Sequence, residues 1–148
     1  MAPDDVRGAF REKFRLDDLT VHESDDWTLS VRPGQPVLGA LVVSSRHLAL
    51  DLSEVPAGSG AGLLDLMAQA EAGAKARFGA VRLNVLCLMM QDPLVHFHLL
   101  PRYGASVDFA GVSWADSGWP GPPNLADNQA GDDQLREIRD VYASLVWQ

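Results

Sequence analysis

Two consecutive apolar-rich segments constrain the fold of this chain more than any other feature. Residues 81–90 are almost entirely apolar, with Asn84 as the polar residue inside the run. A run of this kind indicates a central strand that is covered on both faces. After a break at residues 92–93, residues 95–100 alternate between apolar side chains and two histidines. This period of two predicts a second strand, with the histidines on one face and the apolar residues on the other.

Hydrophobic periodicity elsewhere predicts the remaining helices and strands. We expect helices over residues 4–16 and 61–78 and from Asp132 or Asp133 onward, and strands over residues 19–24, 27–32, 37–44 and 112–115. Together these elements predict an α+β fold with a mainly antiparallel sheet of about five strands, one long helix and short terminal helices. Residues 1–148 are expected to form a single domain, because no linker composition divides them.

Composition narrows the classes of function. The chain has 148 residues, a formal net charge of −8 and a single cysteine. This charge disfavours nucleic-acid binding, and one cysteine excludes a disulfide framework. No apolar stretch approaches the length of a membrane span, and the acidic N-terminus lacks the features of a signal peptide. We therefore expect a cytoplasmic protein whose partner is a small molecule.

His96 and His98 are the strongest candidates for chemistry. Two strand residues two positions apart project from one face, about 7 Å apart along the strand, so both can reach one ligand. Neutral imidazole can act as a nucleophile, a general base or a metal ligand near pH 7. The alternatives are a histidine pair without a role and a metal site. The metal site is disfavoured because no histidine follows His98 and no glutamate occurs between His98 and Glu137.

The residues around the two histidines resemble the motif of a known family. The chain matches the pattern D-P-H-V-H-F-H-V-I-P-R-Y at Asp92, Pro93, Val95, His96, Phe97, His98, Pro101, Arg102 and Tyr103. This pattern is similar to that of a bacterial branch of the histidine triad (HIT) superfamily. Residues 27–52, 82–90 and 111–123 also resemble that branch, so the likeness covers most of the chain.

The resemblance implies a fold, a chemistry and an assembly. The fold is an antiparallel sheet of about five strands with a long helix on one side, usually in a homodimer. The chemistry is hydrolysis or transfer at the α-phosphate of a nucleotide conjugate, such as a dinucleoside polyphosphate or a phosphoramidate. By position, His96 corresponds to the nucleophile that forms a nucleotidyl-histidine. His98 corresponds to the last histidine, which helps to bind the phosphate. No metal or other cofactor is expected.

The chain departs from the family pattern at two positions. Leu94 occupies the place of the first histidine, and Ala40 occupies a place that is histidine in many relatives. A leucine cannot donate a hydrogen bond, so we expect it to narrow and dry the pocket instead. The alternative function is therefore a repurposed HIT scaffold that binds a non-nucleotide small molecule, such as an intermediate of specialised metabolism.

Four further residues are candidates for substrate binding: Arg32, Asn84, Gln91 and Arg102. Arg32 falls where relatives place a ribose-contacting asparagine, and its planar fork suits a phosphate or carboxylate. Gln91 lies near the position of a phosphate-contacting glutamine. Each has a structural alternative, such as a solvent-facing strand end for Arg32 and satisfied burial for Asn84. For Arg102 the alternative is a salt bridge to Asp92.

Overall fold

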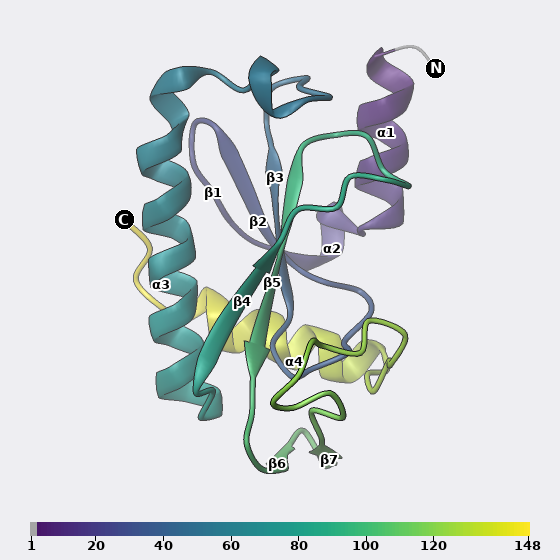
Figure 1. The fold of residues 1–148 in the computed structure, drawn as a ribbon, viewed down its shortest axis with the longest axis vertical. Coiled ribbons are helices and arrows are strands. Elements are labelled where there is room, and N and C mark those ends of the chain that lie inside the picture. The colour runs from purple at the N-terminus through teal and green to yellow at the C-terminus, as the bar shows by residue number, and fades with distance from the viewer. Residues whose placement is uncertain (1–2) are drawn as a thin grey trace.

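The computed structural model describes residues 3–148 of the chain (Figure 1). The helices are α1 (Pro3–Lys13), α2 (Leu16–Leu19), α3 (Gly60–Phe78) and α4 (Asp132–Ala143), and two 3₁₀ turns cover Leu52–Glu54 and Ala57–Ser59. The strands are β1 (Thr20–Glu23), β2 (Trp27–Val31), β3 (Leu41–Ser45), β4 (Arg82–Leu86), β5 (His96–Arg102), β6 (Val107–Phe109) and β7 (Val112–Trp114). No helix within the described residues combines the length and apolarity needed to cross a bilayer.

The main sheet has five strands in the order β1-β2-β3-β5-β4. Every neighbouring pair in it is antiparallel, so the expected α+β fold with a mainly antiparallel sheet is confirmed. The strand expected near residues 112–115 forms as β7. It pairs with β6 in a separate two-stranded sheet rather than extending the main one.

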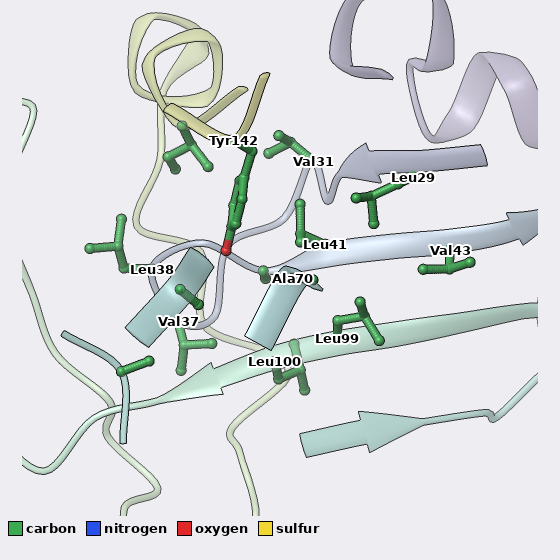
Figure 2. Packing of buried hydrophobic residues seen from close by; sticks show 14 of the residues in the cluster. Leu29, Val31, Val37, Leu38, Leu41, Val43, Ala70, Leu99, Leu100 and Tyr142 are labelled. Carbon is green, nitrogen blue, oxygen red and sulfur yellow. The ribbon is translucent and has the colours of Figure 1, made fainter. Parts of the chain in front are cut away.

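The two faces of the main sheet are covered by different helices. Figure 2 shows the larger core, in which Tyr142 of α4 and Ala70 of α3 pack against sheet residues such as Leu99. The opposite face carries His96 and His98 and is covered in part by α1. A smaller apolar cluster holds α1 and α2 there; it consists of Val6, Phe10, Phe14, Leu16, Val42 and Leu94. The N-terminal helix thus lies over the histidine face of the sheet (Figure 1).

The third strand begins later than its sequence predicts. It was expected over residues 37–44, but β3 starts at Leu41, because Gly39 adopts a left-handed φ of 80° that breaks the extended chain. The Tyr142 hydroxyl donates a hydrogen bond of 2.7 Å to the Gly39 carbonyl. A Cβ on Gly39 would lie 2.8 Å from that hydroxyl oxygen. The glycine therefore permits the close approach of α4, as its position in an apolar stretch suggested.

The prediction of a central strand over residues 81–90 is wrong. The strand formed there, β4, ends at Leu86 and lies at the edge of the sheet. Val85 is 45% exposed and Leu88 is 52% exposed. Apolar composition is the same for a central strand and for an edge strand that is left uncovered, so periodicity could not separate the two. The central position belongs to β3 instead.

The helices begin and end close to where they were expected, with one division. The N-terminal helix expected over residues 4–16 ends at Lys13, because Arg15 has a left-handed φ of 53° that separates α1 from α2. The long helix α3 ends at Phe78, and Gly79, with a φ of 80°, provides the expected C-terminal cap. The last helix begins at Asp132, as predicted.

Candidate functional site

His96 and His98 lie side by side on the face of β5 that α1 partly covers. Their ring centroids are 5.0 Å apart, and both rings line a cavity of about 490 Å³. The other lining residues come from the end of α1 and the turn after it, the turn after β2, the β4–β5 loop and the β7–α4 loop: Lys13, Phe14, Arg32, Pro33, Gly34, Leu88, Met89, Met90, Gln91, Asp92 and Leu125. The predicted orientation of the two histidines toward one recess is therefore confirmed by their placement.

Phe10 of α1 and Phe14 of the turn between α1 and α2 pack against the ring of His96. The ring centroids of Phe10 and Phe14 lie 5.2 and 5.6 Å from that of His96. As a result His96 is only 2% exposed, although it borders the cavity. Neither phenylalanine was predicted to belong to the site, because residues of an amphipathic N-terminal helix give no sequence signal for the sheet face they will cover.

A backbone hydrogen bond sets the protonation pattern of His96. Its Nδ1 lies 2.6 Å from the carbonyl oxygen of Leu94. A carbonyl can only accept, so Nδ1 carries the proton and Nε2 keeps its lone pair. Burial lowers the pKa of His96, although this hydrogen bond and the charge of Asp92 act in the opposite direction. The ring is therefore neutral at pH 7, with a basic nitrogen free.

The second histidine has the opposite arrangement. The Nε of Arg32 donates a hydrogen bond of 3.3 Å to Nδ1 of His98. Nδ1 is therefore the acceptor, and the proton of the neutral ring is on Nε2. Burial, followed by the charges of Arg32 and His96, lowers the pKa of His98 to about 4. The site thus contains one imidazole with a free lone pair beside another with a free N–H donor.

Arg32 brings a positive charge to the same cavity. Its Nη1 donates a hydrogen bond of 2.6 Å to the carbonyl oxygen of Gly34, which fixes the guanidinium beside His98. A Cβ on Gly34 would lie 2.8 Å from that Nη1, so the turn leaves room for the arginine. No salt bridge joins Arg32 to a carboxylate in the described part of the chain. Arg32 thus lines the histidine cavity, and its role in binding a ligand stays a prediction.

The mouth of the cavity contains a lysine that sequence reasoning missed. Lys13 Nζ lies 2.8 Å from Asp92 Oδ2 and ties the last turn of α1 to the β4–β5 loop. Gln91, a predicted binding residue, lines the cavity next to this pair. No motif includes Lys13, and only the tertiary position of α1 brings it to the site.

Asn84 and Arg102 lie at the other end of the sheet, away from this cavity. Arg102 Nε donates a 2.7 Å hydrogen bond to Asp116, and the two side chains are 3% and 1% exposed. Its Nη1 donates a 2.8 Å hydrogen bond to Oδ1 of Asn84. The predicted salt bridge between Arg102 and Asp92 is therefore wrong. Both predicted residues line a smaller hollow beside Trp119 instead.

The effect expected of Leu94 on the pocket is also wrong. Its side chain packs with Val42 and α1 in the smaller apolar cluster and does not line the histidine cavity. Phe10 and Phe14 provide the apolar cover that was expected from Leu94. Its contribution to the site is its main-chain carbonyl, which any residue at this position would supply.

These groups together suit attack on an anionic electrophile. The free Nε2 of His96 can form a bond to an electrophilic atom, while His98 Nε2–H and Arg32 can neutralise charge on neighbouring oxygens. Within residues 3–148, no three histidine, cysteine, aspartate or glutamate side chains are grouped so that they could hold a metal ion.

The fold is shared with several solved structures. A histidine triad protein from Sinorhizobium meliloti 1021 is 17% identical, with a TM-score of 0.67 over 86% of this chain and 90% of that one. A histidine triad protein from Marinobacter aquaeolei VT8 is 20% identical, with a TM-score of 0.66 over 88% and 89% of the two chains. A hypothetical histidine triad nucleotide-binding protein from Sulfolobus tokodaii strain 7 is 14% identical, with a TM-score of 0.65 over 95% and 88%.

Sequence comparison alone identifies no relative. No family model matches the chain, and no curated protein matches it. The structural likeness nevertheless extends over most of this chain and most of each of the three proteins. The chain therefore has the fold of these histidine triad proteins, as the resemblance around His96 implied.

Proposed function

We propose that this protein is a cytoplasmic hydrolase or transferase acting at the α-phosphate of a nucleotide conjugate, through a nucleotidyl-histidine on His96. The observation that carries the proposal is the hydrogen bond from His96 Nδ1 to the Leu94 carbonyl, which leaves Nε2 as a free nucleophile. The nucleotide-binding protein from Sulfolobus tokodaii has the same fold and supports this class of ligand.

The proposed reaction has two displacement steps. In the first, the Nε2 lone pair of His96 bonds to the α-phosphorus, and the bond from phosphorus to the leaving group breaks with its electron pair. In the second, a water or another acceptor hydroxyl bonds to the phosphorus, the P–N bond breaks, and the acceptor's proton passes to solvent. His96 returns to its neutral form, and two easier steps replace one difficult displacement.

Three groups would stabilise the negative charge during both steps. His98 Nε2–H is a donor, because its Nδ1 accepts from Arg32. Arg32 has no carboxylate partner within the described chain, and Lys13 at the cavity mouth carries a second positive charge that Asp92 partly neutralises. Preorganised donors of this kind stabilise charge that develops on nonbridging oxygens.

The same proposal requires motion of Phe14, in the turn between α1 and α2. His96 is 2% exposed beneath Phe10 and Phe14, so phosphorus can reach Nε2 only when the Phe14 ring moves aside. Phe14 is the one of the two that lines the cavity. Substrate binding would then replace this aromatic cover with the nucleotide itself.

The decisive experiment is detection of the covalent intermediate. The protein is mixed with a dinucleoside polyphosphate or with an adenosine phosphoramidate, quenched quickly and measured by intact mass spectrometry. We expect the mass of one added adenylate, mapped by peptide analysis to His96. His22, an imidazole on β1 outside the cavity, is the internal control and should remain unmodified. Nucleotide binding without adduct or AMP release would contradict the covalent mechanism.

Failure to bind any nucleotide would have a wider meaning. It would overturn the proposed substrate class and leave the alternative, a repurposed scaffold for a non-nucleotide small molecule. A binding screen with AMP, GMP and an uncharged nucleoside, made before the kinetic work, separates these outcomes.

The proposal includes a homodimer formed through β4. This strand is the open edge of the main sheet, whereas α4 packs against β1 at the opposite edge. Val81, Val85, Leu88 and Met90 expose apolar surface along and beyond β4. An edge strand with unpaired backbone groups and apolar side chains is a template for pairing with a second chain.

The oligomeric state tests this part of the proposal. Light scattering after size exclusion should give twice the chain mass for the wild-type protein and a monomer for Val85→Glu. Leu64→Glu is the matched control, because Leu64 is 68% exposed and lies on α3 rather than on β4. A monomeric wild-type protein, or dissociation by both substitutions, would contradict pairing at β4.

A further inference from the structure

A second cavity lies on the histidine face of the sheet, between α1 and the ends of β1, β2 and β3. Its volume is about 490 Å³. It is lined by Arg7, Gly8, Phe10, Arg11, Leu16, Glu23, Thr28, Ser44, Ser45, Arg46 and Leu94. None of these residues lines the histidine cavity, although the Phe10 ring in its wall lies 5.2 Å from that of His96. The two cavities are therefore separate sites on one face.

The residues that line this second cavity have a positive net charge, although the whole chain is negatively charged. The chain carries a formal net charge of −8, yet three of its ten arginines, Arg7, Arg11 and Arg46, line this one hollow. Glu23 is the one acidic residue in the lining, and its Oε2 lies 3.7 Å from Arg46 Nη2. The lining therefore has a net charge of +2 and is suited to an anion.

The arginines keep donors that the protein does not use. Arg11 is paired only with Asp17, a carboxylate outside the lining. Arg46 Nη1 donates to the Ser24 carbonyl, and Arg7 donates to the Arg46 carbonyl through one nitrogen. A guanidinium has five N–H donors, so each side chain retains donors for a ligand.

Two buried hydroxyls also lack partners. Thr28 is 6% exposed and Ser44 is 1% exposed, and no hydrogen bond joins either hydroxyl to another described residue. Every fully buried polar side-chain atom of residues 3–148 has a partner. These two hydroxyls must therefore face open space, and the space beside them is this cavity. Because buried polar groups normally have hydrogen-bond partners, these two hydroxyls are available to bind a polar ligand in the cavity.

We propose that this cavity binds a small molecule through a carboxylate or phosphate group. The arginines supply charge-assisted hydrogen bonds to the anion, and the hydroxyls of Thr28 and Ser44 supply neutral ones. Phe10, Leu16 and Leu94 provide an apolar wall for the remainder of the ligand. The site is independent of the proposed reaction at His96, and each can fail without the other.

Occupation of this site would affect the histidine cavity through α1. The helix presents Arg7 and Arg11 to the anion cavity and Lys13 to the histidine cavity, and the next residue, Phe14, lines the histidine cavity from the turn that follows the helix. A ligand held by the first pair would restrain the helix that carries the second pair. A ligand in the anion cavity should therefore also change the amide signal of Phe14.

The test is a ¹H–¹⁵N NMR titration of the full chain with inorganic phosphate and, separately, with benzoate. Saturable chemical-shift changes at the amides of Gly8, Thr28 and Ser44 are expected for at least one probe. A response to phosphate alone identifies a phosphate site, and a stronger response to benzoate identifies a carboxylate on an apolar body. Benzylamine, which has the same ring and the opposite charge, should not bind there.

Substitutions of the lining arginines then test whether the anionic probe binds in this cavity. Arg46→Gln and Arg11→Gln should each weaken probe binding about tenfold, the cost of one charge-assisted hydrogen bond. Arg11→Gln removes only an exposed pair with Asp17 and should fold normally even if Arg46→Gln does not. Arg77→Gln, on α3, is the matched control and should leave affinity unchanged.

Three results would overturn the proposal. The first is an absence of saturable changes with both anions, and the second is changes confined to Gly34 and Gln91 in the histidine cavity. The third is unchanged affinity in Arg11→Gln.

Discussion

The two ends of β5 differ in how completely their polar groups are satisfied. At the first end, His96 Nε2 and His98 Nε2 have no protein partner within the described residues, and Arg32 has no carboxylate. At the other end, Arg102 donates four hydrogen bonds, to Asp116, to Asn84 and to the Gly121 carbonyl. A group with open hydrogen-bonding capacity can serve a ligand, whereas a saturated one maintains the fold. We therefore expect residues that share one sequence motif to have two different roles.

The largest effect is expected from His96→Asn. Removal of a covalent nucleophile lowers kcat/KM by about a thousandfold or more. The loss of one buried ring should cost much less in stability than it costs in activity, because Asn retains a donor for the Leu94 carbonyl. Kinetics of AMP release and urea unfolding of the same variant measure the two quantities. A variant that keeps its activity would show that the open end of β5 is not catalytic.

The opposite profile is expected from Asp116→Asn at the saturated end. The substitution leaves the buried Arg102 guanidinium without its counter-charge, which lowers the free energy of unfolding by about 3–5 kcal/mol. The rate per folded molecule should remain unchanged, since neither residue borders the histidine cavity. A fall in kcat with normal stability would contradict the division of β5 into two ends.

Stability should depend on pH through His98. Its folded-state pKa is about 4, below the ordinary value of 6.5. As the pH falls, the unfolded chain therefore binds the proton first, and the folded state loses stability. The contribution of neutral His98 to the free energy of unfolding is fully present above pH 6.5 and is lost as the pH falls towards 4. Between pH 7 and pH 5 this loss amounts to about 2 kcal/mol.

The measurement is urea unfolding at pH 7 and pH 5 for the wild-type protein and for His98→Gln. The wild-type protein should lose about 2 kcal/mol more than the variant over this interval. His22→Gln is the control for a histidine outside the cavity and should behave like the wild-type protein. An equal loss in all three proteins would mean that His98 is not held neutral by its surroundings.

The sequence predicted the individual helices and strands better than it predicted which of them lie next to one another. Alternation around His96 identified β5 and its two faces, because the period of a strand is a local property. The edge position of β4 and the covering of His96 by Phe10 and Phe14 depend on which segments meet in space. Periodicity carries no information about that choice.

The same limit explains the errors in the candidate site. Gln91 and Arg32, which were chosen by their position relative to the family pattern, both line the histidine cavity. Asn84 and Arg102 were assigned to the ligand because they lie near the motif in sequence. The strand carries Arg102 away from His96, and its partner Asp116 lies in a loop that no pattern connects with it.

A smaller effect on stability and activity is expected from a substitution of Phe14, whose ring packs against His96 at the first end of β5. Phe14→Leu keeps an apolar residue but shortens it, so unfolding should become easier by about 1 kcal/mol. If Phe14 must move before phosphorus reaches His96, the substitution should raise the rate of adduct formation. Rapid-quench mass spectrometry measures that rate. Phe10→Leu is the matched control, because Phe10 also touches His96 but does not line the cavity.

The smallest effects are expected from substitutions of two side-chain amides, Gln91 at the histidine cavity and Asn84 beside Arg102. Gln91 borders the histidine cavity and is exposed, so Gln91→Ala should change stability by less than about 0.5 kcal/mol. It should raise KM about threefold, the value of one weak hydrogen bond to the ligand. Asn84→Ala removes an acceptor from Arg102 and should reduce stability by about 1 kcal/mol without a change in KM. If the two variants exchange these profiles, satisfaction by protein partners does not distinguish ligand-binding residues from structural ones in this fold.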